Sequence, residues 1–442
     1  MTTMEILRPG DPGYDDGAGG FAGVGTPALV VRPRDPDEVA AALADAVRAG
    51  RVVSVRSGGH SLAGHCTNAG GTVIDLCHLD RVDVLDARRR LVRVGGGARW
   101  DRVAAALAPH GWGLTSGDTT TVGVGGLTLG GGIGWMVRRF GLTIDQLVGA
   151  RVVTAEGRLL TATAEENADL FWALRGGGGN FGIVVDLDFV VHEVGSVHHG
   201  AITYVLDDAT DLVTRWRDVM RTAPDELSST LALVPRFPGA PPTAQVLVCY
   251  AGEPSAPVSE ADAAIEPLLE LGTVSEATIT ERPYASILEE PFRAPGIRPV
   301  CRSSLTSLGD DVVSAVAAAH HGPAPTALSL RSLGGAMSRV PADATAFAHR
   351  DAEAMVVAFV LLGEDASESD VASALRPWRD VAALGSGTYI GFQGSATPED
   401  VAAAYPPATY ARLAGVKRTY DPGNVFARNH NIEPGAVAVP AR

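Results

Sequence analysis

Residues 119–148 read TTTVGVGGLTLGGGIGWMVRRFGLTIDQLV, a run in which glycine, a residue that loses much backbone entropy on folding, recurs again and again. Three further glycine clusters lie at 58–60, 94–98 and 175–182, and none as dense follows them. Any one of these clusters is typical of a tight turn in a β-rich domain. Four of them within the first 182 residues favour another interpretation, in which backbone packs closely against a large ligand or other backbone.

The glycine run at 122–134 does not match the common nucleotide-binding fingerprints. The first strand of a dinucleotide-binding unit is missing just before it, and no acidic residue closes a strand about 20 residues later. No Gly-Lys-Ser or Gly-Lys-Thr follows, which excludes a P-loop. The sequence therefore argues against a nicotinamide-dependent dehydrogenase.

Composition limits the class of protein further. The chain has 442 residues, is 46% hydrophobic and carries a net charge of −15 without a Lys/Arg run, so it is predicted to bind neither nucleic acid nor a membrane. Residues 1–20 contain no apolar core of a secretory signal, and no apolar stretch of 18 residues exists. The four cysteines lack CxxC spacing, which predicts free thiols and a cytoplasmic location.

The pattern of elements predicts an α+β protein with two domains. Residues 1–195 read as one unit with many strands, including a strand and helix over 27–50 and a hairpin over 147–163. Residues 196–405 alternate strands and helices, which predicts a second α/β domain with a mostly antiparallel sheet covered by helices on one face. Residues 406–442 form a helix and a polar tail.

The histidine in "VRSGGHSLAGH" (55–65) has three interpretations: an incidental residue of a phosphate loop, a metal ligand or a covalent anchor. A metal site would draw on His60, His65, Cys66, Cys77 and His78, but their spacings match no usual zinc site. No metal is therefore predicted. His65 receives no functional role and is interpreted as an ordinary loop histidine.

Five segments, in the same order along the chain, resemble the berberine-bridge-enzyme-like group of FAD-linked oxidases, which has a vanillyl-alcohol-oxidase (PCMH) type FAD-binding domain. The segments are RSGGHS (56–61), the run at 119–148, NADLFWALRGGGGNFGIV (167–184), LGGAMSRVPADATAFAHR (333–350) and YDPGNVFARNHNI (420–432). The resemblance implies that residues 1–195 hold FAD and 196–405 cover the flavin face. Residues 406–442 would return to the FAD domain.

The resemblance also implies which residues hold the cofactor. His60 would bond to the flavin 8α-methyl, since neutral imidazole is a nucleophile near pH 7. Glycine-rich turns would offer backbone N–H donors to the pyrophosphate without obstruction by side chains. The predicted cofactor-binding residues are His60, Arg56, Ser57, Gly58, Gly59, Ser61, Gly117, Thr119, Thr121, Val122, Gly125, Gly126, Gly132, Gly182, Val184, Asn429 and Asn431.

Two departures from the family pattern refine this picture. Many relatives attach the flavin a second time through a cysteine, at the place held here by Thr119, so we predict a single covalent link. Hydroxyl groups at 119–121 would contact the flavin edge instead. Val122 matches the position that governs oxygen access to the flavin in the family, and valine there favours an oxidase.

Tyr389 matches the family tyrosine that removes the proton of the substrate hydroxyl; the alternative is a tyrosine that merely packs in a sheet. Because an ordinary tyrosine has a pKa near ~10, a base role requires a nearby cation or the flavin environment. Leu62, Ile133 and Ala358 match pocket positions that are polar in relatives. The predicted pocket is therefore apolar, which favours a bulky aromatic or polyketide-like substrate over a sugar.

Three functions follow from the resemblance. The first is an FAD-linked oxidase that transfers a hydride from a small molecule to flavin N5 with O₂ as acceptor, used in bacterial secondary metabolism. The second is an oxygenase that keeps an oxygenated flavin, which the resting flavin spectrum and peroxide release would distinguish. The third is a non-catalytic covalent flavoprotein, which anaerobic flavin reduction by a substrate would exclude.

Overall fold

The structure is a computed structural model that describes residues 4–235, 239, 242–291 and 296–435. Helix α2 (Pro36–Arg48) shows how the local sequence sets its elements. The Asp35 carboxylate accepts a hydrogen bond from the Glu38 amide (2.8 Å), and Pro36 stands in the first turn. Apolar side chains spaced about one turn apart, Val39 and Leu43 among them, are buried. This confirms the helix predicted within 27–50.

Two sheets build the first unit. The smaller has the order β1 (Glu5–Leu7), β4 (Leu29–Arg32), β6 (Thr72–Asp75), β5 (Val53–Arg56), and its last three strands are parallel. The larger is antiparallel, in the order β11 (Leu159–Thr163), β10 (Leu147–Val153), β12 (Ile183–Val190), β8 (Leu91–Gly95), β7 (Val82–Asp86). Short pairs join β2 (Gly19–Gly20) to β3 (Gly23–Val24) and β9 (Trp112–Gly113) to β13 (His192–Glu193). The β10–β11 pair confirms the predicted hairpin.

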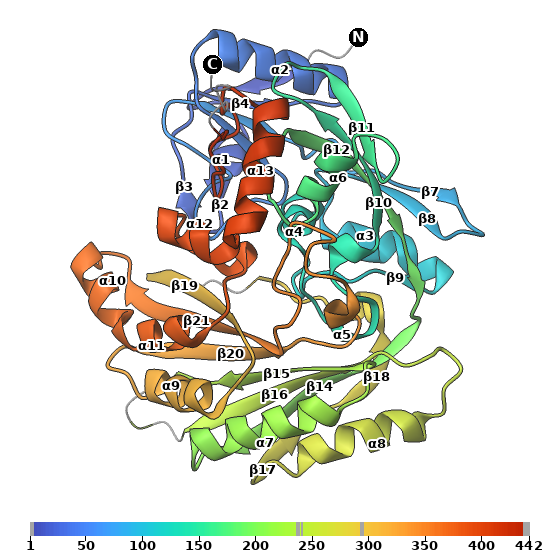
Figure 1. The fold of residues 1–442 in the computed structure, drawn as a ribbon, viewed down its shortest axis with the longest axis vertical. Helices are drawn as coiled ribbons and strands as arrows, with labels where there is room; N and C mark the ends of the chain where they lie inside the picture. Colours follow the sequence, from blue (N-terminus) through green and yellow to red (C-terminus); the bar gives the residue numbers. More distant parts are fainter. Residues whose placement is uncertain (1–3, 236–238, 240–241, 292–295, 436–442) are drawn as a thin grey trace, which may run out of the picture.

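The second unit is built on one eight-stranded sheet whose described pairings are all antiparallel. Its order is β17 (Val274–Ala277), β14 (Ser196–Val205), β16 (Thr243–Tyr250), β15 (Leu227–Leu233), β20 (Thr326–Ser332), β21 (Ala354–Gly363), β19 (Ile297–Thr306), and β18 (Thr280–Pro283) also pairs with β14. One face of the sheet is covered by helices α7 (Ala209–Thr222), α8 (Val258–Leu269), α9 (Asp310–His320) and α11 (Arg376–Leu384). The opposite face is turned toward the first unit (Figure 1).

The helices of the first unit are α1 (Tyr14–Ala18), α2, α3 (Trp100–Leu107), α4 (Val124–Gly130), α5 (Val137–Phe140) and α6 (Ala168–Leu174). Those after it are α7 (Ala209–Thr222), α8 (Val258–Leu269), α9 (Asp310–His320), α10 (Glu368–Ala374), α11 (Arg376–Leu384), α12 (Pro398–Ala404) and α13 (Pro407–Tyr420). No helix in the described part of the chain is both long and apolar enough to cross a lipid bilayer.

The C-terminal part of the chain returns to the first unit, where α13 lies in red against α6 in Figure 1. Val401 and Ala404 of α12 already belong to the first unit's core, so the return begins before the predicted boundary at 406. Lys417 fixes this segment, since its fully buried ammonium bonds Asp421 (2.7 Å) and the Asn180 carbonyl (2.8 Å). The tail is thereby held beside the glycine cluster at 175–182.

Candidate active site

A cavity of about 520 Å³ lies between the first unit and the inner face of the eight-stranded sheet of the second unit, called the large sheet below. Pockets for cofactors and small ligands span about 300 to 1,000 Å³, so this one is large enough for such a molecule. Its wall contains glycines from all four clusters of the first unit, side chains from the large sheet and residues of the C-terminal tail. Three separate parts of the chain must therefore come together before the cavity exists.

His60 enters this cavity from the turn that follows β5. Gly59, at φ +77°, adopts a backbone conformation that side chains rarely allow and so directs the next residue inward. The His60 ring stacks on Phe21 (centroids 5.4 Å apart), and its Nε2 lies 2.8 Å from Thr121 Oγ1. Burial, together with the positive charges of Arg99 and Arg56, lowers the His60 pKa. The imidazole is therefore neutral at pH 7, the form that acts as a nucleophile.

The glycine clusters make this geometry possible by allowing loops to touch through their backbones. A Cβ on Gly58 would lie 2.2 Å from the Gly123 nitrogen and 2.6 Å from the Thr121 carbonyl oxygen. At Gly126 and Gly179, by contrast, a Cβ would meet no atom, because both residues border the cavity. The first kind of glycine joins two loops, and the second kind keeps the wall free of side chains.

Tyr389 lies in the wall formed by the second unit and is only 3% exposed. Its amide donates to Ser303 Oγ (3.1 Å), and its phenolic oxygen accepts a hydrogen bond from the Gly132 amide (3.2 Å). Burial raises the Tyr389 pKa, while the Gly132 and Ile133 amides and the Arg331 charge act in the opposite direction. The phenol is thus protonated at neutral pH but is held by groups that favour its ionised form.

A charged group in the same cavity wall as Tyr389 was not anticipated from the sequence. Arg331 of β20 lines the cavity, pairs with Asp118 (2.7 Å) and lies over the Phe392 ring (4.8 Å). Although burial opposes ionisation, Arg331 holds the Asp118 pKa below its ordinary value. Glu289 is nearby, and burial together with the Asp118 charge raises its pKa. The sequence signal for Arg331 was the alternation of apolar and polar side chains along β20, which places Arg331 on the face opposite the helices.

Comparison with known proteins decides the family. The FAD binding domain model matches residues 27–163, and the berberine and berberine-like model matches 388–433. The (R)-6-hydroxynicotine oxidase of Paenarthrobacter nicotinovorans is 30% identical over 458 residues, covering 97% of this chain and 96% of the relative. The chain belongs to the berberine-bridge-enzyme-like family of FAD-linked oxidoreductases. It is an enzyme, and its cofactor is FAD.

Solved structures of family members agree with this assignment. The crystal structure of 6-hydroxy-D-nicotine oxidase from Arthrobacter nicotinovorans has a TM-score of 0.87 at 28% identity, covering 98% of this chain and 99% of the other. A glucooligosaccharide oxidase from Acremonium strictum, which carries 6-S-cysteinyl, 8α-N1-histidyl FAD, has a TM-score of 0.84 at 25% identity, covering 98% of each chain. The predicted two-domain α+β fold of the family is thereby confirmed.

The cavity suits the family's FAD. Its wall at Gly126 and Gly179 lacks side chains, so backbone can approach a pyrophosphate closely. Asn429 also lines it and has a buried amide oxygen without a partner in the described structure. His65, which was predicted to be an ordinary loop histidine, lies in the same wall. Its two ring nitrogens also lack a partner in the described structure. Burial lowers the His65 pKa to about 3. Buried polar groups without partners indicate a missing polar ligand or water.

Most residues predicted from the family pattern line this cavity. They are Ser57, Gly58, Gly59, His60, Ser61, Leu62, Gly117, Thr119, Val122, Gly125, Gly126, Ile133, Gly182, Val184, Tyr389 and Asn429. Five others lie behind or away from the wall: Arg56, Thr121, Gly132, Asn431 and Ala358.

Arg56 bonds Asp75 (3.2 Å) and the Gly19 carbonyl (3.3 Å), and so it supports the turn before His60. Gly132 supports Tyr389 through its amide. Asn431 donates to Glu433 (3.2 Å), and its buried amide oxygen, like that of Asn429, has no partner in the described structure. Arg56 and Gly132 thus support other residues of the site, whereas the cofactor role of Asn431 stays a prediction.

The predicted contacts of the 119–121 hydroxyls with the flavin edge stay a prediction, and the structure shows the protein partners of two of these hydroxyls. Thr119 Oγ1 donates to the Asp118 carboxylate (3.0 Å), and Thr121 Oγ1 pairs with His60. Backbone hydrogen bonds between residues 118–120 and Glu289 fix the position of Thr119 in the cavity wall. Both hydroxyls are thus engaged by protein groups.

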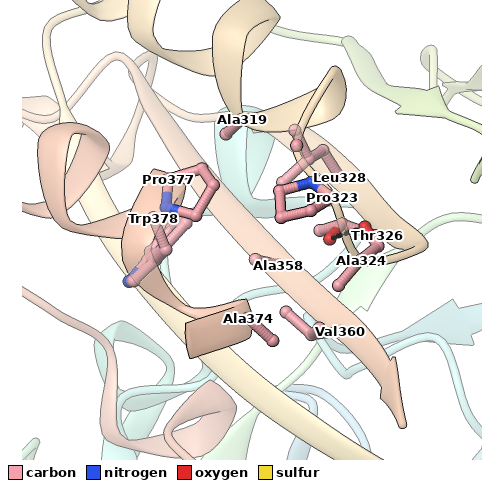
Figure 2. Close-up of a pocket in the computed structure, with 11 residues that line it drawn as sticks. Ala319, Pro323, Ala324, Thr326, Leu328, Ala358, Val360, Ala374, Pro377 and Trp378 are labelled. Atoms are coloured by element: carbon pink, nitrogen blue, oxygen red, sulfur yellow. Dashed lines mark hydrogen bonds between the residues drawn. The ribbon is translucent and has the colours of Figure 1, made fainter. Parts of the chain in front are cut away.

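Ala358 is the clearest correction. It belongs to the core between the sheet and its helices and borders a hole of about 10 Å³ beside Trp378, too small for more than one water (Figure 2). Its neighbour Phe359 lines the large cavity instead. Because side chains alternate along a strand, a register error of one residue moves the predicted position to the opposite face.

No three His, Cys, Asp or Glu side chains lie close enough together to hold a metal ion in the described ranges.

Proposed function

We propose that this protein is an FAD-dependent oxidase that removes a hydride from a hydroxylated aromatic or polyketide-like molecule. The observation that carries the proposal is the placement of Tyr389 and His60 in the wall of one cavity. The phenol of Tyr389 is buried, oriented by the Gly132 amide and close to the positive charge of Arg331. A buried phenol with such neighbours can take a proton from a substrate hydroxyl.

In this proposal His60 anchors the cofactor and Tyr389 transfers the proton. His60 would hold the cofactor covalently, as the only link, because Thr119 cannot form a thioether. When bound, FAD supplies the hydride acceptor and passes the electrons to molecular oxygen. Tyr389 Oη would take the hydroxyl proton as the adjacent carbon loses its hydride. Val122, at the cavity wall, leaves room for oxygen to enter.

The pocket chemistry supports an apolar substrate. Leu62, Ile133, Phe359, Ile390 and Phe392 line its wall and offer no hydrogen bonds through their side chains. A sugar would leave hydroxyl groups unpaired against this part of the wall, while Asp118, Glu289 and Arg331 line the cavity elsewhere. An aromatic compound would bury its rings there and present one hydroxyl to Tyr389. A tailoring step in bacterial secondary metabolism requires substrates of this kind.

Two further expectations belong to the same proposal. We expect the enzyme to act in the cytoplasm, where its four cysteines, free in the structure, would stay reduced. We expect its macromolecular partners to include neither nucleic acid nor membrane, since its net charge is −15.

The proposal is tested by mixing the purified protein anaerobically with a panel of hydroxylated aromatics, polyketides and oligosaccharides. We expect an aromatic or polyketide compound to bleach the flavin absorbance, and air to restore it with release of hydrogen peroxide. Reduction by oligosaccharides alone would contradict the substrate class, and an oxygenated product without peroxide would indicate an oxygenase. A tryptic digest after acid precipitation should carry flavin on the His60 peptide and none on the Thr119 peptide.

A further inference from the structure

Thr121 is engaged with the side chain proposed to anchor the flavin. Its Oγ1 lies 2.8 Å from His60 Nε2, the only hydrogen bond that the structure gives to the His60 ring within the described residues. The opposite constraint on the ring is Phe21, whose plane is inclined by 19° to it. The stacking on Phe21 fixes the plane of the imidazole, and the contact with Thr121 fixes the direction of Nε2 within that plane.

The pairing is imposed by the backbone. The Cβ that Gly58 lacks would lie 2.6 Å from the Thr121 carbonyl oxygen, and the one that Gly123 lacks would lie 2.2 Å from the Gly58 nitrogen. The loops that carry His60 and Thr121 are therefore in direct backbone contact where Gly58 meets Thr121 and Gly123. The Thr121 hydroxyl can lie next to the imidazole because these glycines leave no side chain between the two loops.

We propose that Thr121 positions His60 for covalent flavin attachment and selects Nδ1 as the nitrogen that bonds. A threonine hydroxyl accepts one hydrogen bond and donates another. If it accepts from Nε2–H, the imidazole proton is kept on Nε2, and the lone pair of Nδ1 is free to attack. This inference rests on the proposed covalent link through His60.

The step balances without a further co-reactant beyond molecular oxygen. A bond forms between His60 Nδ1 and the flavin 8α carbon, and one C–H bond of that methyl group breaks. The two electrons of the reaction pass to O₂, and the two protons, one from the methyl group and one from Nε2, complete hydrogen peroxide. After attachment Nε2 holds a lone pair, and the Thr121 hydroxyl reverses its role and donates to it. Threonine thus satisfies the ring before and after the reaction, which valine cannot do.

The experiment uses the full chain produced without riboflavin and then incubated with FAD in air. The fraction of flavin that stays with acid-precipitated protein is measured against time. We expect Thr121→Val to attach flavin at least tenfold more slowly than the native chain and Thr121→Ser to stay within threefold of it. The matched control is Thr128→Val in the same segment, since Thr128 Oγ1 is buried and has no partner in the described structure. It should attach flavin at the native rate.

A native rate for Thr121→Val at saturating FAD would overturn the inference, as would equal slowing by Thr121→Ser or Thr128→Val. A second measurement does not depend on the variants folding: NMR of the purified native flavin peptide identifies the bonded ring nitrogen. Nδ1 is expected, and attachment through Nε2 would overturn the inference. Native protein without flavin on His60 would instead contradict the proposed function itself.

Discussion

The two walls of the cavity are built in different ways. The first unit contributes loops that touch through glycines, such as Gly58 against Gly123, so its wall consists largely of backbone. The large sheet contributes alternating side chains, with Arg331 and Phe359 on the inner face and Leu328 and Ala358 on the helix-covered face. Glycine clusters in the sequence predict a wall made of backbone. A side-chain wall depends on strand register, which one residue of error inverts.

The largest effect is expected from crowding the backbone wall. Gly58→Ala places a methyl group 2.2 Å from the Gly123 nitrogen, and since backbone surrounds it, the two loops must separate. We expect FAD content to fall below about a tenth of the native value, the loss expected when a close backbone approach is blocked. Flavin absorbance per protein measures it. Gly415→Ala in α13, where a Cβ meets no atom, should keep the full content; an FAD-replete Gly58→Ala protein would contradict the backbone-wall account.

Tyr389→Phe tests the reactive group on the side-chain wall. Removing the phenolic oxygen deletes the proposed base and leaves the buried ring in place, so flavin content should not change. We expect the rate of anaerobic flavin reduction to fall about 10²- to 10⁴-fold, the usual contribution of a general base. Stopped-flow absorbance provides the measurement. A loss below about threefold, with bound flavin, would exclude Tyr389 as the base.

The register of β21 is tested by introducing the same residue on its two faces. Ala358→Gln buries an amide without partners beside Trp378, and we expect about 3 kcal/mol of destabilisation from overpacking and unpaired polar atoms. Phe359→Gln should leave the stability nearly native and change KM or substrate preference. Denaturant unfolding and steady-state kinetics separate the two outcomes. The reverse pattern would show that Ala358, as predicted from the sequence, faces the cavity.

The smallest effect concerns the pH dependence set by Arg331. Burial raises the Tyr389 pKa, so the ionised base is scarce at neutral pH and flavin reduction should speed up as the pH increases. Arg331 lowers that pKa, and Arg331→Met should therefore move the rising limb to higher pH and slow the reaction at neutral pH. The pH profile of the reduction rate measures the shift. An unmoved limb in Arg331→Met would remove Arg331 from the reaction.

Sequence patterns were most reliable where backbone conformation or capping carries the signal. The helix begun by Asp35 and Pro36 and the turn that aims His60 both follow from such local rules. Arg331 and Asp118 were missed because they lie 213 positions apart and meet only when the inner face of β20 covers the loop at 118. Nothing in the sequence reveals that Asp118 and His60 engage the hydroxyl groups of Thr119 and Thr121.

The sequence by itself determined the family and its cofactor, and it pointed to the glycine loops, His60 and Tyr389 that line the cavity, because those features reside in contiguous motifs and in the conformations that glycine alone tolerates. The tertiary structure decided which faces of β20 and β21 meet the cavity, that Thr121 holds His60, and that Arg331 stands beside Tyr389. These contacts join segments far apart along the chain. Their geometry depends on register and packing, which no local pattern of residues specifies.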